Sequence, residues 1–118
     1  MKVLESAADL ERFVAENGDC VVVFSTTHCP ACMRLRRELE NRAEIAGVPV
    51  AEAVLNRMPR RDAAVLAKRF GLAHVPTIVV FARGRRAAQR VGFAPIGKLE
   101  VWIGDVAGKR EGGAEAER

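Results

Sequence analysis

The sequence predicts an α/β fold in which a single mixed β-sheet is flanked by helices. Apolar runs rich in β-branched residues, at 20–24 and 75–81, are typical of strands buried on both faces of a sheet. Segments with helical periodicity separate the strands, in the order helix, strand, helix, strand, helix, hairpin, helix. A strand–helix–strand unit implies a parallel pair and a hairpin adds an antiparallel one, so the sheet should contain both.

The first half of the chain should hold two helices around a buried strand. A helix should begin after Ser6, whose hydroxyl suits a capping position, and end near residue 17. The strand at 20–24 follows it. The next helix is expected from residue 30 to about residue 46, with Pro30 in its first turn, where a missing N–H group costs little.

A second strand and a short helix should come next. The strand is expected at 48–55, and a basic loop at 56–61 follows it. Asp62 can cap the helix at 63–70, and Gly71 should close it.

The remaining elements form a hairpin and a last helix. The strand at 75–81 should turn back through Arg83-Gly84 into a strand at 87–91. An amphipathic helix should follow at 99–106, with its beginning near Pro95.

Length and composition favour one compact domain, expected at 1–107, followed by a charged, disordered tail at 108–118. No apolar run approaches the ~18 residues of a membrane helix, and the N-terminus lacks the pattern of a secretory signal. The 19 basic and 15 acidic residues are scattered along the chain rather than gathered with aromatic residues into a basic stripe. We therefore expect a cytoplasmic monomer that binds neither nucleic acid nor membranes.

The stretch Cys29-Pro30-Ala31-Cys32 carries the candidate chemistry. Cys29 falls between a buried strand and a helix, where free N–H groups and the positive end of the helix dipole favour a thiolate. The spacing lets the two sulfurs meet across one helical turn, so Cys29 should attack a partner's disulfide and Cys32 should resolve the mixed disulfide. Arg36, one turn beyond Cys32, should add to the positive field.

A metal site is the alternative use of this pair. Structural zinc sites usually need two more ligands, and the candidates are Cys20, His28 and His74. Cys20 lies on the buried strand and is expected to be a core thiol. His28 is expected either on the surface or beside the thiolate, and His74 is expected to be a loop residue.

Several segments resemble the thioredoxin family, in matching order and over roughly residues 5 to 107. They are Val21-Val22-Val23-Phe24, Cys29-Pro30-Ala31-Cys32, Ala67-Lys68-Arg69-Phe70-Gly71-Leu72, Val75-Pro76-Thr77, Phe81-Ala82-Arg83-Gly84 and Val91-Gly92. The resemblance implies a thioredoxin fold with Cys29 and Cys32 as catalytic residues and no separate cofactor. It also implies that Pro76 is cis, that Val75 offers its backbone to an extended substrate, and that Gly92 lets the substrate backbone approach. His28, Pro30 and Ala31 would line the same substrate site.

The sequence departs from the family pattern at four places. His28 stands where the family has tryptophan, and Pro30-Ala31 stands where it has Gly-Pro. The family's buried acid, six residues before the first cysteine, corresponds to Val23. Glu52 on the next strand could replace that acid, although an exposed strand residue is the simpler expectation. Arg37 lies near the place of the family's helix-kinking proline.

The resemblance implies a disulfide reductase that acts on protein disulfides and is recycled by a reductase of its own. A glutathione-dependent, glutaredoxin-like enzyme is the second interpretation, because glutaredoxins share the Cys-Pro-x-Cys pattern. Val75 stands where glutaredoxins favour threonine, and their Gly-Gly-x-Asp signature is absent near Gly92. A metal-binding module that uses Cys29 and Cys32 is the third.

Overall fold

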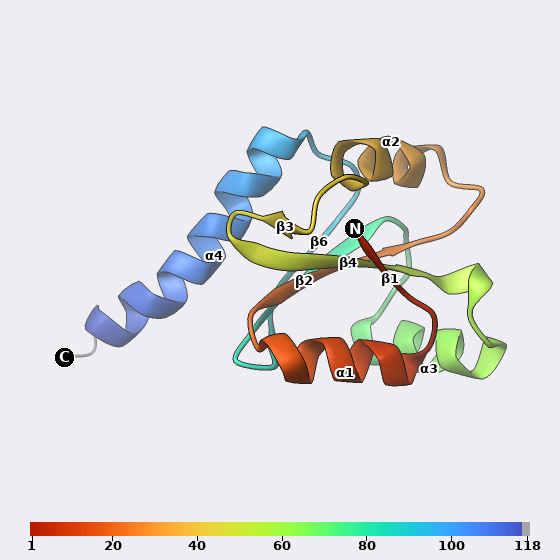
Figure 1. Cartoon of the computed structure of the whole chain (residues 1–118), viewed down its shortest axis with the longest axis horizontal. Coiled ribbons are helices and arrows are strands. Elements are labelled where there is room, and N and C mark those ends of the chain that lie inside the picture. Colours follow the sequence, from red (N-terminus) through yellow and green to blue (C-terminus); the bar gives the residue numbers. More distant parts are fainter. Residues whose placement is uncertain (117–118) are drawn as a thin grey trace.

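The computed structural model describes the backbone of residues 1–116 and the side chains of residues 1–107. Its elements, in chain order, are β1 (Lys2–Leu4), α1 (Ala7–Asn17), β2 (Cys20–Ser25), α2 (Pro30–Leu39), β3 (Glu44–Ile45), β4 (Val48–Val54), the 3₁₀ turn η1 (Leu55–Arg57), α3 (Arg60–Phe70), β5 (Thr77–Ala82), β6 (Arg85–Val91) and α4 (Ile96–Ala116). Figure 1 shows them as a sheet between two layers of helices. The predicted fold class is confirmed.

The central sheet mixes both kinds of strand pairing. Its strands lie in the order β1-β4-β2-β5-β6, and the short β3 pairs with β4 outside this path. β4 is parallel to both β1 and β2, whereas β5 is antiparallel to both β2 and β6. The buried strand β2 is therefore central, and β1 and β6 are the two edges.

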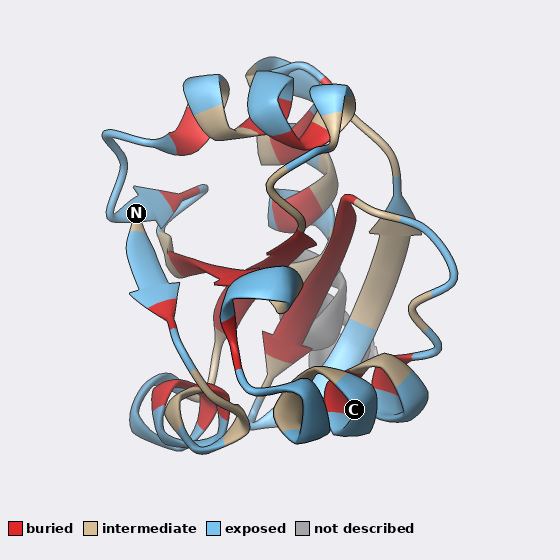
Figure 2. Cartoon of the chain, turned by 90° about the vertical axis from the view of Figure 1, so that its right-hand side faces the viewer, coloured by how far each residue is buried: buried red, intermediate tan, exposed pale blue. Residues whose placement is uncertain are grey.

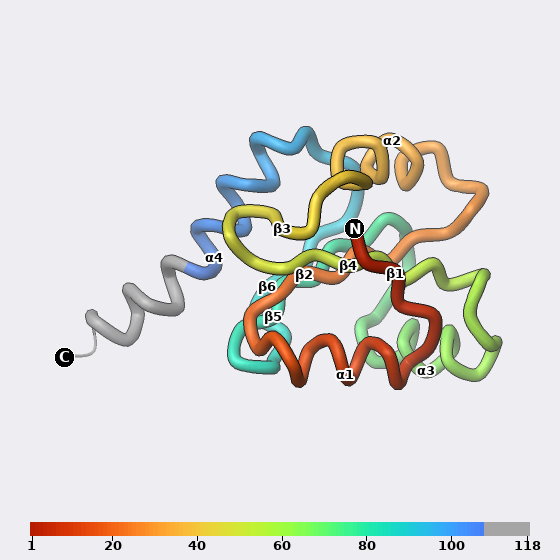
Figure 3. Tube along the Cα trace, viewed as in Figure 1, coloured from red at the N-terminus to blue at the C-terminus, as the bar shows by residue number. Residues whose placement is uncertain are grey.

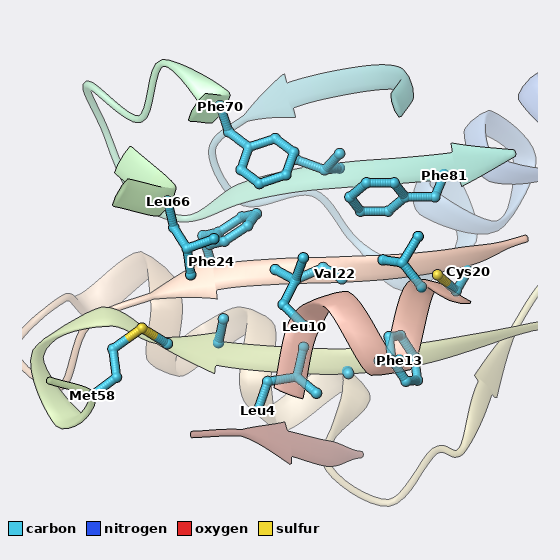
Figure 4. Packing of buried hydrophobic residues seen from close by; sticks show 14 residues of the cluster. Leu4, Leu10, Phe13, Cys20, Val22, Phe24, Met58, Leu66, Phe70 and Phe81 are labelled. Atoms are coloured by element: carbon cyan, nitrogen blue, oxygen red, sulfur yellow. The ribbon is translucent and has the colours of Figure 1, made fainter. Parts of the chain in front are cut away.

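Residues of β2 alternate between the two faces of the sheet, as strand geometry requires. Val22 and Phe24 pack with α1 and α3, in a cluster that also holds Leu10, Leu66 and Phe70 (Figure 4). On the opposite face, Val21 and Val23 pack with Leu35 and Leu39 of α2 and with Leu99 and Ile103 of α4. Figure 2 shows that the central strands are buried from both sides, which explains their continuous apolar sequence.

The helix predicted to reach residue 46 is shorter than expected. α2 ends at Leu39, and β3 pairs with β4 through a tight turn at Ala46 and Gly47, which have φ angles of +52° and +80°. Positive φ at both central residues is typical of the two-residue hairpins that match strand twist. The turn therefore makes Ile45 a strand residue. The sequence analysis also missed β1, a three-residue strand with only one buried side chain.

Asp62 has a different role from the predicted cap. α3 begins at Arg60, after Pro59, so Asp62 falls inside the first turn. Its carboxylate accepts a hydrogen bond from the backbone N–H of Ala7 at 3.0 Å and so connects α3 to the start of α1. The predicted closure of α3 by Gly71 is confirmed, because Gly71 adopts the left-handed conformation.

The last helix begins near Pro95, as predicted, but ends later than expected. α4 starts at Ile96 and continues to Ala116, beyond the predicted end at residue 106. The expected tail at 108–118 lies outside the residues whose side chains are described, and its disorder stays a prediction. Within the described part of the chain, no helix has the length and apolar character needed to cross a membrane.

The parallel pairing of β2 and β4 brings two loops to the same end of the sheet. The β2–α2 loop and the β4–α3 connection lie together at that end (Figure 3). Asn56 joins them: its side-chain oxygen accepts from the Thr27 N–H at 3.0 Å, and its amide donates to the Thr27 hydroxyl at 2.6 Å. The cysteine pair follows directly on the loop that these two hydrogen bonds hold.

Candidate active site

Cys29 and Cys32 lie together at the N-terminus of α2. Cys29 is the N-cap residue, and its sulfur accepts a hydrogen bond from the Cys32 backbone N–H at 3.1 Å. Pro30 occupies the first helical turn, as expected, and its fixed φ suits that position. Both cysteines are free thiols. The first sulfur thus lies at the positive end of the helix dipole, and the second lies one turn inside.

The two thiols differ in exposure. Cys29 is partly exposed, whereas Cys32 is only 1% exposed. Burial, together with hydrogen bonding to Cys29, raises the pKa of Cys32 to about 12. A hydrogen bond from the Thr26 backbone and the positive charge of Arg36 act in the opposite direction and lower the Cys32 pKa. The inner thiol therefore depends on its neighbours for ionisation.

The loop before β5 brings a backbone carbonyl to the outer sulfur. The Val75–Pro76 peptide bond is cis. The Cys29 thiol donates to the Val75 carbonyl oxygen, with 3.7 Å between sulfur and oxygen. The Pro76 carbonyl in turn accepts from the Gly92 N–H at 2.8 Å. Three segments far apart in the chain thus meet at one place, and each contains residues that the sequence analysis selected.

The surface next to Gly92 is open. Gly92 has a φ angle of +98°, and a Cβ placed there would meet no atom within 4 Å. Glycine suits this conformation because side chains make positive φ unfavourable. Beside it, the Arg34 guanidinium lies 4.3 Å from the centre of the Phe93 ring. His28 and Pro30, the two neighbours of Cys29 in the chain, are exposed, and Ala31 is partly exposed.

Glu52 was expected to be an exposed strand residue, but the structure shows it buried. It is 4% exposed and lies beside Val23 in the β2–β4 register. Its carboxylate accepts hydrogen bonds from Arg36 at 2.7, 2.9 and 3.1 Å and from the Ser25 hydroxyl at 2.7 Å. The expectation of exposure is wrong because β4 is buried on both faces. An ion pair therefore lies under the active-site helix.

Three residues of this site were missed in the sequence. Ser25 is a partner of Glu52, and the backbone of Thr26 is a partner of Cys32. Both residues come at the end of the apolar run of β2, and no motif in the sequence around them indicates these contacts. Asn56 lies 29 positions from the loop residue that it holds. Knowledge of the exact register between β2 and β4 would have predicted that Ser25 and Asn56 lie at this site.

The other candidate metal ligands are not gathered around the pair. Cys20 begins β2, whereas Cys29 and Cys32 come after the end of that strand, and Cys20 is fully buried in the core. His74 is an exposed loop residue. Among the described residues, no three His, Cys, Asp or Glu side chains form a group that could hold a metal ion.

The cysteines should differ sharply in reactivity toward iodoacetamide. Burial raises the pKa of Cys20 to about 12, so its thiol stays protonated at neutral pH and is also inaccessible. We expect alkylation of the folded, reduced protein to label Cys29 first and to leave Cys20 unmodified, as measured by peptide mass spectrometry. Unfolding in urea should make all three cysteines reactive. Labelling of Cys20 at the rate of Cys29 in folded protein would contradict this assignment.

Comparison with known proteins agrees with this architecture. The sequence profile of the thioredoxin-like domain matches residues 6–107. A thioredoxin of Rhodospirillum rubrum is 28% identical over 105 residues, which cover 87% of this chain and 96% of that protein. The crystal structure of Fasciola hepatica thioredoxin has a TM-score of 0.72 at 29% identity and covers 87% of this chain and 96% of its own.

A larger protein also contains a similar segment. The bovine protein disulfide-isomerase A5 is 31% identical over 84 residues, which make up 70% of this chain but only 16% of that protein. The similarity is therefore to one part of a longer molecule. Because the family profile matches residues 6–107, nearly all of the predicted domain, the chain belongs to the thioredoxin-like domain family.

Proposed function

We propose that this protein is a thiol–disulfide oxidoreductase that reduces disulfides in other proteins through Cys29 and Cys32. One observation carries the proposal. A partly exposed sulfur caps α2 and accepts the Cys32 N–H, while the second sulfur is buried one turn away. This arrangement separates a thiol that can meet a substrate from one that can only meet its neighbour.

The reaction has two exchange steps. The Cys29 thiolate attacks one sulfur of a substrate disulfide, forms a mixed disulfide and releases the first substrate thiolate. Cys32 then attacks the Cys29 sulfur, which forms the Cys29–Cys32 disulfide and releases the second substrate thiolate. Two electrons pass to the substrate, and the two released thiolates take up the protons that the cysteines lose.

The substrate site in this proposal comprises Val75 and Gly92, which are partly exposed, together with Pro76, which is buried. An extended peptide could pair with the backbone of Val75, as in strand addition, while the open space at Gly92 admits its main chain. His28, Pro30 and Ala31 would contact the substrate beside Cys29. Recycling would need a reductase as electron donor, and a cytoplasmic location would supply the reducing environment.

A redox titration tests the proposal. Protein incubated in a series of glutathione or dithiothreitol buffers should form one intramolecular disulfide in a two-electron transition, as measured by thiol trapping and mass spectrometry. When the fully reduced protein is mixed with insulin, it should reduce insulin disulfides and form its own Cys29–Cys32 disulfide. If Cys29 and Cys32 stay unlinked across the series, or if metal binds stoichiometrically and insulin is not reduced, the proposal is wrong.

A further inference from the structure

The ion pair beneath α2 has a geometry that fixes a positive charge close to the inner thiol. Arg36 donates from Nε to both oxygens of Glu52, at 3.1 and 2.9 Å, and from Nη2 to Oε2 at 2.7 Å. The same guanidinium lies 3.5 Å from the Ser25 hydroxyl. Two N–H groups directed at one carboxylate leave Arg36 little freedom to turn away.

Glu52 is held in place by several hydrogen bonds. Four of them reach its two oxygens, three from Arg36 and one from the Ser25 hydroxyl. The carboxylate is 4% exposed, so loss of its positive partner would leave a buried charge without compensation. Its geometry is that of a support for Arg36.

Arg36 is four residues after Cys32 on α2, and positions four apart lie on the same face of a helix. The Arg36 charge lowers the pKa of Cys32, whereas burial and Cys29 raise it. The positive charge of the pair therefore acts on the inner sulfur.

We propose that Arg36, held in place by Glu52, is a positioning residue that favours the thiolate of Cys32 during resolution. The inference rests on the proposed function. The step stays balanced: Cys32 attacks the Cys29 sulfur, the Cys29–substrate bond breaks, and the departing substrate thiolate takes up the Cys32 proton. A fixed cation thus favours the Cys32 thiolate in a chain that has valine at the position of the family's buried acid.

The two steps can be separated with an aromatic disulfide reagent that releases a coloured thiolate. In a Cys20→Ala background, reduced protein should release one equivalent when Cys29 attacks and a second when Cys32 resolves the mixed disulfide. Absence of the first phase in the otherwise unchanged protein would reject the proposed function. The second phase tests Arg36 alone.

We expect Arg36→Met to slow the second phase about tenfold and to displace its pH profile upward by about one unit. Arg36→Lys should retain much of the rate, because the charge remains. Glu52→Gln keeps an oxygen that can accept from Arg36 and should slow resolution less than Arg36→Met. Arg37→Met removes one exposed charge from the same helix and serves as the matched control.

Two results would overturn the inference. One is a second phase in Arg36→Met that matches that of Arg37→Met in rate and pH profile. The other is a slowing in Glu52→Gln at least as large as that in Arg36→Met, because the carboxylate would then be the active group. Circular dichroism checks the fold of each variant, and Arg36→Gln replaces the methionine variant should that one not fold.

Discussion

Replacement of Cys29 by serine is expected to abolish disulfide exchange, because a hydroxyl cannot form the mixed disulfide on which the reaction depends. The effect should be complete, since the buried Cys32 cannot reach a protein substrate in its place. Cys32→Ser should behave differently. Cys29 would still attack, but nothing would resolve the product, so mixed disulfides should accumulate.

Insulin reduction and non-reducing gel electrophoresis measure these two outcomes. Cys20→Ser is the matched control, because it removes a thiol from the core and should leave exchange intact at some cost in stability. Equal insulin reduction by the unchanged protein and by Cys29→Ser would reject the assigned nucleophile. Failure of Cys32→Ser to form mixed disulfides with a protein disulfide would reject the division of roles.

Phe24→Ala is expected to cause the largest loss of stability, about 3–5 kcal/mol. The Phe24 side chain is fully buried at the centre of the sheet, and its ring centre lies 5.2 Å from that of Phe70. Phe70 also contacts Phe81, at 5.8 Å between centres. Removal of the Phe24 ring therefore leaves a cavity between the sheet and Phe70 of α3.

Urea denaturation measures this change as a lower free energy of unfolding. Val65→Ala in α3 is the matched control: Val65 is 52% exposed, so its replacement should change stability by no more than about 0.5 kcal/mol. A loss below about 1 kcal/mol in Phe24→Ala would mean that the core closes around the missing ring. Such a result would contradict the rigid packing described for this face.

The fold was predictable because its strongest signals are local. The β-branched run of β2, the capping serine before α1 and the Arg83-Gly84 turn each act over a few residues. The elements that were missed or misplaced depend on tertiary pairing. β1 is a three-residue strand that is defined by its pairing with β4. The helix formers after Leu39 suggested a longer α2, but part of that segment forms β3, which pairs with β4.

The candidate site was predictable for the cysteines and less so for what surrounds them. Cys29, Cys32 and Pro76 lie in short motifs that resemble the thioredoxin family, and the resemblance implied that they lie close together. The partnership of Arg36 with Glu52 depends instead on which face of β4 meets α2. A shift of one residue in strand register would have turned Glu52 to the opposite face, and composition does not determine that register.

The two edge strands of the sheet determine whether two molecules of this protein can associate through their sheets. An exposed strand edge offers unpaired N–H and C=O groups to another molecule and so invites aggregation. β1 limits this hazard by being only three residues long. β6 is longer, but Arg85 and Arg86 are exposed along it, and two such strands brought together would repel each other. The protein should therefore resist edge-to-edge association even when concentrated.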